Sequence, residues 1–283
     1  MSIWFDETFK SSRFGLKVTR TLFSAQSPFQ KVDIFETEEL GRVMTLDDAF
    51  MTSEGDEFFY HELLTHPPLL TAEAPERVLV IGGGDGGTVR EVLRHASVKQ
   101  CVMIEIDELV VRACMEHLPT IGTAWKDPRL EVRFADGVDY VKNSDEAKYD
   151  VVLLDGTDPI GPGEVLFDLE FFRACKRMLK PDGVLALQSE TPLLMSEAFF
   201  ETQVKLRTLF SKVAPYLGPV PLYPSGLWSW TWCSDTRDPF VIDEARAKGI
   251  VDQLRWYNLD VHRGAFAQPN YVKRGIADRV GKE

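Results

Sequence analysis

The chain has 283 residues, 44% of them hydrophobic, with a formal net charge of -12 at pH 7 and a pI near 5.0. This size is sufficient to bury a full core, as one large domain or as one domain with a smaller companion. The acidic balance argues against nucleic acid or an anionic membrane as the main partner and is compatible with cationic small substrates. No signal peptide opens the sequence and no apolar run approaches the roughly 18 residues of a membrane span. We therefore expect a cytoplasmic location and no membrane or nucleic-acid partner.

The cysteines give no sign of a disulfide framework or a metal site. Cys101, Cys114, Cys175 and Cys233 lie far apart without a C-x-x-C pair. This usage is typical of buried thiols in a reducing compartment. No set of His, Cys, Asp and Glu has the spacing of metal ligands, and we expect no metal.

Residues 1–55 alternate apolar and polar side chains in short segments, which predicts a small antiparallel β domain. The segments cover residues 14–18, 29–35 and 42–46, with turn-forming residues between them. An open sheet edge is normally covered or paired, so this domain is the expected contact in a homodimer or homotetramer.

Residues 56–283 alternate strands and helices, which predicts a mostly parallel sheet with helices on both faces. A first helix is expected to end before Pro67 and Pro68, because proline disfavours helix in the residue that precedes it. Strands are expected at residues 78–81, 101–104, 130–134, 150–154, 184–188, 212–217 and 227–233. Helices are expected at residues 88–95, 108–117, 137–143, 169–179 and 195–210, before a partly helical tail from Asp243.

The stretch from residue 77 to residue 90 has the pattern of a strand, a tight turn and a helix. Gly82, Gly84 and Gly87 follow the G-x-G-x-x-G spacing, in which glycines let the backbone approach a bound nucleoside closely. Glu105 ends the next apolar run, near the offset of about 20 residues where such units keep an acid for ribose hydroxyls. Asp85 lies inside the turn, where a carboxylate repels a pyrophosphate and favours a cation. The pattern indicates a nucleoside that carries positive charge.

Acidic residues follow every strand of the predicted parallel sheet. They are Asp85, Glu105, Asp136, Asp155 and Glu190. Asp136 alone is typical of a helix cap, but five acidic strand ends indicate one acidic crevice, since ligands of open α/β sheets bind at the carboxyl ends of the strands. The loop 155–164 is irregular and acidic, and we expect it to order over bound substrate as a lid. An ordinary Asx-Pro connection is the plainer interpretation.

These motifs together resemble the spermidine synthases of the polyamine aminopropyltransferase family, over almost the whole chain. The residues that carry the resemblance are Tyr60-His61-Glu62, the glycine turn 82–87, Glu105-Ile106-Asp107, Asp136-Gly137, the loop 155–162, Gln188-Ser189-Glu190 and residues 223–226. The glycine motif is shared with many methyltransferases. The expected fold class is therefore α/β: a Rossmann-like, methyltransferase-type, mostly parallel sheet with helices on both faces (residues 56–283), preceded by a small antiparallel β-sheet domain (residues 1–55).

The resemblance implies transfer of the aminopropyl group of decarboxylated S-adenosylmethionine, a co-substrate, to putrescine, with spermidine and methylthioadenosine as products and no further cofactor. On the nucleoside side it implies Gln30, Asp85, Glu105, Asp136, Gly137 and Pro162. It implies Asp155 as the proton acceptor with Tyr60 in support. Around the diamine it implies His61, Asp85, Asp155, Asp158, Gln188, Glu190 and Tyr223. Gly156 departs from the family, where many members have Ser or Cys, and we expect it to add loop freedom.

Physical chemistry supports two of these roles independently. Ordinary S-adenosylmethionine carries a carboxylate beside its amine, so Asp85 repels it and attracts the decarboxylated form. The nucleophile must be a neutral amine, although an amine with a pKa near 10 is protonated in water at pH 7. Asp155 is the expected proton acceptor, while Asp158 and Glu190 suit the end of the diamine that stays an ammonium.

Several other functions remain open from the sequence. The acceptor amine could be cadaverine, agmatine or spermidine in place of putrescine. An S-adenosylmethionine methyltransferase shares the fold and Glu105, but Asp85 and the loop 155–164 argue against it. A nicotinamide oxidoreductase has only the glycine spacing in its favour. A noncatalytic polyamine-binding protein does not need Asp155 and Tyr60 beside the point of transfer.

Overall fold

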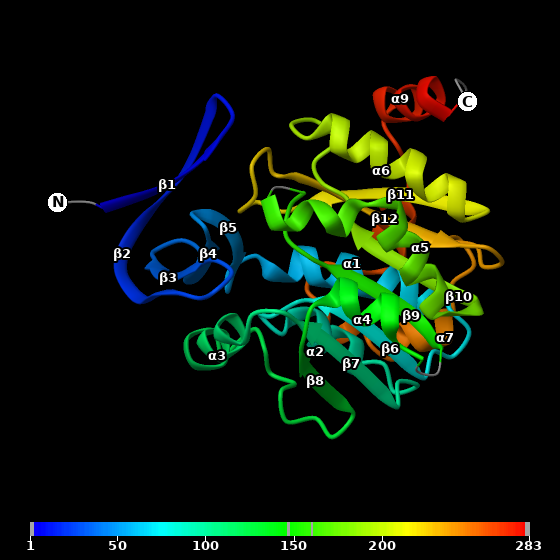
Figure 1. Ribbon diagram of the computed structural model, residues 1–283, viewed down its shortest axis with the longest axis horizontal. Coiled ribbons are helices and arrows are strands. Elements are labelled where there is room, and N and C mark those ends of the chain that lie inside the picture. The colour runs from blue at the N-terminus through cyan, green and yellow to red at the C-terminus, as the bar shows by residue number, and fades with distance from the viewer. Residues whose placement is uncertain (1–2, 146–147, 160, 281–283) are drawn as a thin grey trace.

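Two β-sheets divide the protein. The computed structural model describes residues 3–145, 148–159 and 161–280, apart from the side chains of Gly161 and Pro162. A five-stranded antiparallel sheet stands at one end, drawn in blue in Figure 1, and a seven-stranded, mostly parallel sheet carries the helices. This is the α/β fold with a preceding antiparallel sheet that the sequence predicts.

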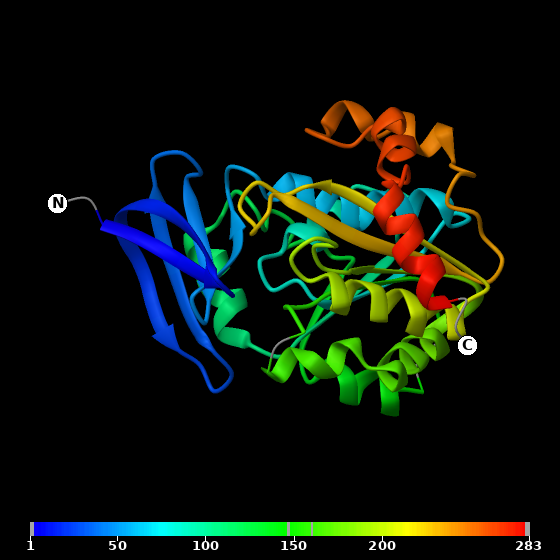
Figure 2. The same cartoon turned by 90° about the horizontal axis from the view of Figure 1, so that it is seen from above.

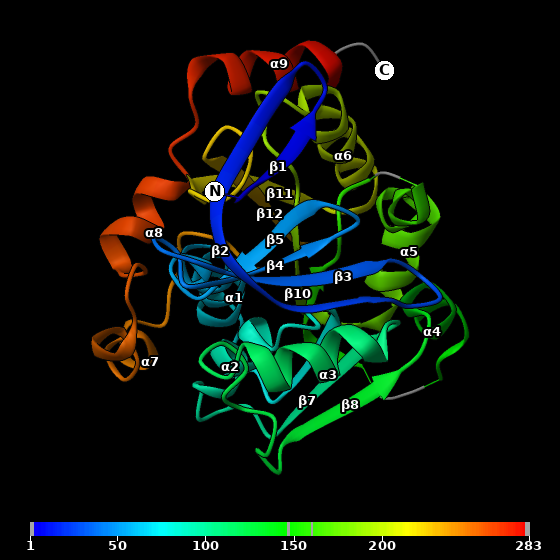
Figure 3. The ribbon, with the colours of Figure 1, turned by 90° about the vertical axis from the view of Figure 1, so that its left-hand side faces the viewer.

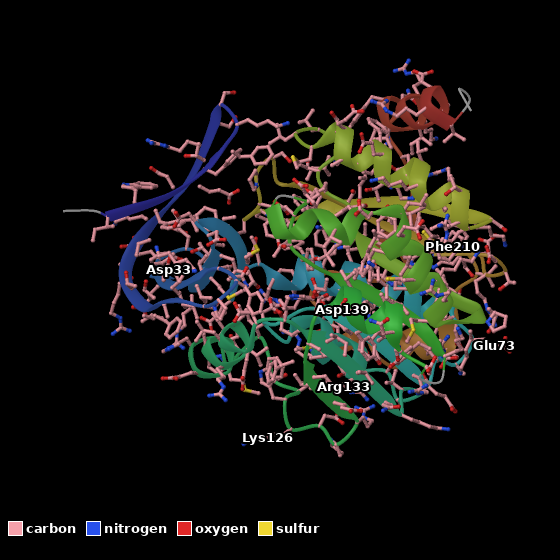
Figure 4. The ribbon with its side chains drawn as sticks, in the orientation of Figure 1. Asp33, Glu73, Lys126, Arg133, Asp139 and Phe210 are labelled. Atoms are coloured by element: carbon pink, nitrogen blue, oxygen red, sulfur yellow. The ribbon has the colours of Figure 1, made fainter. Side chains whose placement is uncertain are left out.

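The first sheet is a meander, in which each strand pairs with the next in the chain. Its strands are β1 (Ile3–Phe9), β2 (Ser12–Gln26), β3 (Lys31–Thr37), β4 (Arg42–Leu46) and β5 (Ala49–Ser53). The segments expected from alternation fall largely in β2, β3 and β4, and β1 and β5 add two strands that the pattern does not single out. Val32 and Ile34 of β3 are fully buried. Asp33 between them, labelled in Figure 4, is also buried and pairs with Lys31 at 2.7 Å.

The second sheet reverses its strand order in the middle. Its strands are β6 (Arg77–Gly82), β7 (Gln100–Glu105), β8 (Leu130–Phe134), β9 (Tyr149–Asp155), β10 (Leu179–Gln188), β11 (Lys212–Pro219) and β12 (Leu227–Ser234). They are arranged β11-β12-β10-β9-β6-β7-β8, with β6 to β10 parallel and β12 antiparallel to both of its neighbours, β10 and β11. The order reverses between β6 and β9, and ligands of open α/β sheets bind at such a switch point.

Helices cover both faces of this sheet, as Figure 2 shows. One face carries α1 (Glu57–Thr71), α2 (Gly87–Leu93), α7 (Glu244–Lys248), η2 (Val251–Gln253) and α8 (Leu259–Ala265). The other carries α4 (Gly137–Asn143), η1 (Gly161–Phe167), α5 (Leu169–Met178), α6 (Ser196–Leu209) and α9 (Asn270–Val280). The helix α3 (Glu108–His117) packs against β2 and β3 of the first sheet. None of the helices in the described part of the chain is long and apolar enough to cross a lipid bilayer.

Alternate residues of the central strands supply two separate cores. On β6, Val78 and Val80 belong to the core under α1, whereas Leu79 and Ile81 belong to the core under α5. The second core extends to Phe210 after α6, labelled in Figure 4. The four cysteines are buried free thiols, as expected.

The expected element positions are close to the observed ones. The helices predicted at 108–117 and 137–143 coincide with α3 and α4, and the other three differ by at most two residues at each end. The strand expected at 184–188 begins earlier, at Leu179, and its register with β9 is irregular between Leu179 and Val184. Pro181, Asp182 and Gly183 lie at this irregularity.

The prediction that the first helix ends before the prolines is wrong. The helix α1 continues through Pro67 and Pro68 to Thr71. A proline inside a helix leaves the carbonyl four residues earlier without its N–H partner. Tyr216 of β11 compensates at Leu63, since its hydroxyl donates a hydrogen bond of 2.9 Å to that carbonyl.

The tail from residue 243 is fastened to the outside of α1 by a buried carboxylate. Glu62 accepts hydrogen bonds from the backbone N–H groups of Arg255, Trp256 and Tyr257 at 2.8, 2.9 and 2.7 Å. A carboxylate that accepts several N–H bonds forms strong, charge-assisted contacts. The tail therefore supports the helix that carries Tyr60 and His61.

Candidate active site

One large cavity, of about 830 Å³, lies where the first sheet faces the carboxyl ends of β6, β7 and β9. Figure 3 looks onto this end of the molecule, with the first sheet in front of the second. The predicted site residues that line the cavity are Gln30, Tyr60, His61, Asp85, Glu105, Asp136, Gly137, Asp155, Asp158 and Tyr223. The side chain of Pro162 lies outside the described residues. Gln188 lines a small apolar pocket beside the cavity instead.

The cavity wall is strongly acidic. Its described carboxyl-bearing residues are Asp6, Glu7, Asp47, Asp48, Asp56, Glu57, Asp85, Glu105, Asp136, Asp155 and Asp158. His61 is the single basic side chain among the lining residues that the structure describes. Such a wall attracts cationic ligands.

Glycine brings the β6 and β9 ends into direct contact. Gly82 has φ +83°, and a Cβ at this position would lie 2.1 Å from the carbonyl oxygen of Asp155. The N–H of Gly83 donates to the same carbonyl at 3.0 Å. Because only glycine tolerates this conformation and this approach, the turn fixes Asp155 beside the loop that carries Asp85.

Asp85 is an ionised carboxylate held from two sides. Its Oδ1 accepts the N–H of Gly87 at 2.9 Å, and its Oδ2 lies 3.2 Å from Nε2 of His61. Burial alone raises the pKa of Asp85, but the charge of His61 and these hydrogen bonds outweigh it and lower the pKa to about 2. The carboxylate is ready to receive a cation at neutral pH.

His61 lies between two carboxylates. Its Nδ1 is 2.6 Å from Oε2 of Glu57, one turn earlier on α1. A Cβ on Gly87 would lie 2.3 Å from the imidazole, so glycine lets the loop before α2 pack directly on the ring. Burial opposes the charged form, but Asp85 and Glu57 raise the pKa of His61 well above its ordinary value.

Asp155 accepts hydrogen bonds from two hydroxyl groups. Tyr60 donates to its Oδ1 at 2.8 Å, and Thr88 donates to its Oδ2 at 2.6 Å. Burial raises the pKa of Asp155, although the nearby His61 charge opposes this. Burial and Asp155 raise the pKa of Tyr60 well above its usual value, so Tyr60 stays a hydrogen-bond donor. Thr88 was not among the predicted residues, although it directly follows the glycine turn.

Glu105 and Gln30 lie on the side of the cavity near β7. Glu105 accepts the N–H of Asp107 at 2.9 Å, and burial raises its pKa to about 7. The amide of Gln30 donates to Oδ2 of Asp107 at 3.1 Å, and the hydroxyl of Ser27 donates to the same oxygen at 2.7 Å. These bonds join the first sheet to the β7 end.

Asp136 both lines the cavity and caps α4. Its Oδ1 accepts the N–H groups of Val138 and Asp139 at 2.7 and 3.2 Å. Asp136 therefore caps α4, as the sequence pattern favours for an isolated acid, and both cap bonds go to its Oδ1. Gly137, at the start of α4, stacks closely on Ile81, since a Cβ there would lie 2.5 Å from that side chain.

The half-buried Asp158 and the buried Glu190 form a second acidic cluster. Glu190 is fully buried, does not line the cavity, and takes a positive φ of 68°. Gln188 donates to its Oε1 at 3.1 Å, while its Oε2 has no hydrogen-bond partner among the described residues. Burial raises the pKa of Asp158, and burial together with Asp158 raises that of Glu190 well above its usual range. Tyr223 lies nearby, with its hydroxyl bonded to the carbonyl of Met51 at 2.7 Å.

Several lining residues were not predicted. Glu7 and its neighbours on β1 reach the cavity from the first sheet, and the sequence carries no signal for this because it depends on how the sheets meet. Asp56 and Glu57 had a usable signal: Glu57 and His61 are four residues apart on one helix, the spacing at which side chains meet.

Comparisons with known proteins agree with this geometry. The family model described as "Spermine/spermidine synthase domain" matches residues 57–243, and "Spermidine synthase tetramerisation domain" matches residues 3–54. A polyamine aminopropyltransferase of Thermoanaerobacter sp. (strain X514) is 41% identical over 281 residues, covering 99% of this chain and 100% of that protein. One from Prochlorococcus marinus (strain MIT 9313) is 43% identical over 279 residues, covering 96% of each.

Solved structures give the same result. The crystal structure of a spermidine synthase in complex with the transition state analogue AdoDATO has a TM-score of 0.94 and 39% identity, covering 97% of this chain and 95% of that chain. Spermidine synthase from Thermotoga maritima has a TM-score of 0.91 and 37% identity, covering 97% and 94%. The fold and site therefore define an aminopropyltransferase enzyme. The chain belongs to the spermidine synthase family of polyamine aminopropyltransferases.

Proposed function

We propose that the enzyme transfers the aminopropyl group of decarboxylated S-adenosylmethionine to putrescine, giving spermidine and methylthioadenosine without a further cofactor. The observation that carries this proposal is the pair of carboxylates at the switch point of the sheet. Asp85 follows β6, Asp155 ends the adjacent β9, and Gly82 and Asp155 are directly opposite each other in the ladder. Asp85 is ionised and suits an ammonium. Asp155 is half-buried beside Tyr60 and suits a proton transfer.

The reaction needs a neutral amine and a leaving thioether. The amine nitrogen attacks the carbon attached to the sulfonium, a C–N bond forms, and the C–S bond breaks with its electron pair returning to sulfur. Before the attack, one N–H bond of the substrate ammonium breaks and its proton passes to the Asp155 carboxylate, which leaves the neutral amine as the nucleophile. Burial favours this direction because it raises the pKa of Asp155, and alignment of nitrogen, carbon and sulfur supplies most of the acceleration.

Each end of the cavity has its own ligand in this proposal. Glu105 takes the ribose hydroxyls, Asp136 and Gly137 the adenine, and Gln30 and Pro162 line the thioadenosine. Asp85 takes the ammonium of the aminopropyl group. In this proposal His61, Asp158 and Tyr223 surround the diamine. Gln188 and Glu190 do not line the cavity and act through Asp158.

The first sheet is the proposed contact between subunits of a homodimer or homotetramer. Its match to a tetramerisation domain supports this, and Ile3 and Trp4 at its edge are 65% and 60% exposed. An exposed edge strand with large apolar side chains is suited to pairing with a second copy.

The test is an assay with decarboxylated S-adenosylmethionine and an equimolar mixture of putrescine, cadaverine, agmatine and spermidine, read by mass spectrometry. We expect methylthioadenosine and an equal increase of spermidine above the amount added. A different dominant aminopropylated amine would overturn the choice of putrescine alone. Folded protein that forms no methylthioadenosine would overturn the transfer reaction in this chain, and methylation of an amine by ordinary S-adenosylmethionine would replace it.

A further inference from the structure

A chain of alternating charges extends from the cavity into the protein interior. It begins at Asp85 and continues through His61 and Glu57 to Arg90 and Glu91 on α2. Arg90 forms a bidentate ion pair with Glu57: its Nη1 donates to Oε1 at 3.0 Å and its Nη2 donates to Oε2 at 2.8 Å. Its Nε donates to Oε1 of Glu91 at 2.6 Å. The five residues are all buried, with 9% exposure or less.

The geometry requires His61 to carry two N–H groups. Nδ1 lies 2.6 Å from an oxygen of Glu57 and Nε2 lies 3.2 Å from an oxygen of Asp85. A neutral imidazole has one N–H and donates to one carboxylate only, so two carboxylate partners call for an imidazolium. Glu57 stays ionised despite its burial because His61 and Arg90 lower its pKa.

We propose that Glu57, gripped by Arg90, is a positioning residue that keeps His61 an imidazolium and thereby holds the Asp85 carboxylate toward the ammonium of the aminopropyl donor. The proposal rests on the proposed function and adds two residues that do not themselves bind the donor in it. With all four side chains charged, Asp85 and Glu57 balance His61 and Arg90. The site then presents a fixed carboxylate to a cation over the whole neutral pH range.

The surroundings of His61 set the expected pH dependence. The charged groups that face it are Asp56 and Glu57 from α1, Asp85 from the β6–α2 loop and Asp155 from β9, with Arg90 of α2 behind Glu57. Removing the charge of Glu57 leaves Arg90 facing His61 without its counter-charge. The lost Glu57 charge and the unbalanced Arg90 charge both favour the neutral imidazole. We therefore expect His61 of the variant to titrate in the neutral pH range. Above this new ionisation the ring loses its second N–H, and the Asp85 carboxylate is no longer held toward the donor ammonium.

Glu57→Gln is therefore expected to raise the KM for decarboxylated S-adenosylmethionine about tenfold for each pH unit above the new ionisation, with kcat less affected. The matched control ligand is methylthioadenosine, which shares the nucleoside but lacks the aminopropyl ammonium. Its inhibition constant is expected to keep the wild-type pH dependence. Adding Arg90→Gln to Glu57→Gln removes the facing positive charge and is expected to move the ionisation back to higher pH.

The outcomes separate the proposal from the proposed function. A wild-type enzyme without aminopropyl transfer overturns the function, and the histidine titration below still decides the charge of His61. An active enzyme in which Glu57→Gln leaves the pH dependence of the donor KM unchanged, or changes it equally for methylthioadenosine, overturns the positioning role.

Imidazole nitrogen NMR of the wild-type protein covers the case in which the variants fail to fold. The His61 signals, assigned with His61→Gln, are expected to show two N–H groups across neutral pH. Loss of one proton near the ordinary histidine pKa of about 6.5 overturns the proposal without any variant at position 57 or 90.

Discussion

The Asp85 cluster and the Asp158–Glu190 cluster differ in the charge of the residue that neighbours each carboxyl group. Asp85 lies against the His61 imidazolium, and its pKa falls to about 2. Glu190 lies against another acid, Asp158, and burial with this neighbour raises its pKa well above its usual range. Depth of burial is therefore a poor guide to charge, since the partner decides it. The charge of His61 favours the ionised form of Asp85, whereas burial favours the protonated form of Glu190.

Asp155 lies between these clusters, and its replacement gives the largest expected effect. Asp155→Asn keeps the shape but cannot take a proton, and it accepts a hydrogen bond from only one of the Tyr60 and Thr88 hydroxyl groups, which both donate to Asp155. We expect kcat to fall about 100- to 10,000-fold with little change in either KM. Steady-state kinetics with both substrates checks this. Tyr60→Phe is the matched variant, since it removes only the hydroxyl group that donates a hydrogen bond to Asp155. A kcat within a few-fold of the wild type would exclude Asp155 as the proton acceptor.

Asp85→Asn removes the carboxylate charge that faces the cavity in the first cluster and so tests the first half of the comparison. The loss of a charge-assisted hydrogen bond of about 1.5 to 3 kcal/mol predicts a KM for the decarboxylated donor about 10- to 100-fold higher. Discrimination against ordinary S-adenosylmethionine should weaken, because the variant no longer repels its carboxylate. Competition between the two sulfonium compounds measures the ratio. An unchanged ratio contradicts the account of Asp85.

Glu190→Gln tests the second half through stability. The native state holds the Glu190 proton above the pH at which the unfolded chain releases it, so wild-type stability falls as pH rises from about 4.3, the unfolded value, toward the raised folded pKa. The slope is about 1.4 kcal/mol per pH unit for one proton. Glutamine has no proton to lose, so the variant should be more stable than wild type at neutral pH and equal to it below about pH 4.

The measurement is thermal unfolding of both proteins from pH 4 to pH 8. Glu201→Gln, at an exposed position on α6, is the control for loss of one carboxylate. A Glu190→Gln curve that runs parallel to the wild-type curve throughout would show that Glu190 is ionised in the native state.

Gly156→Ser gives the smallest expected effect and concerns the short link between Asp155 and Asp158. A Cβ at Gly156 would lie 2.8 Å from Cδ1 of Leu166. A side chain at this position therefore has to displace the end of the Leu166 side chain, and the φ of Gly156 is not in the left-handed region. We expect a few-fold loss of kcat/KM for the acceptor, restored by Leu166→Ala in the same chain. An additive loss in the double variant would show that the two positions do not compete for space.

The sequence predicted the parts of this site that depend on local pattern. Strand periodicity and the glycine turn place Asp85 and Asp155 at adjacent strand ends, and the structure has them there. The reach of Glu7 into the cavity and the position of Glu190 behind Asp158 depend on how distant segments pack, and no local pattern encodes that. The helix through Pro67 and Pro68 has the same cause, since the hydroxyl that satisfies Leu63 comes from Tyr216, far along the chain.

Carboxyl carbon NMR of the unliganded protein tests the contrast between the two clusters most directly. Aspartate and glutamate labelled at the side-chain carboxyl carbon report protonation as pH is varied, with Asp85→Asn and Glu190→Gln to assign the signals. The account predicts that Asp85 is ionised at every pH from 5 to 8, while Glu190 is still protonated when exposed glutamates have lost their protons. Titration of Glu190 near the ordinary glutamate pKa of about 4.3, or a protonated Asp85 at pH 5, would contradict it.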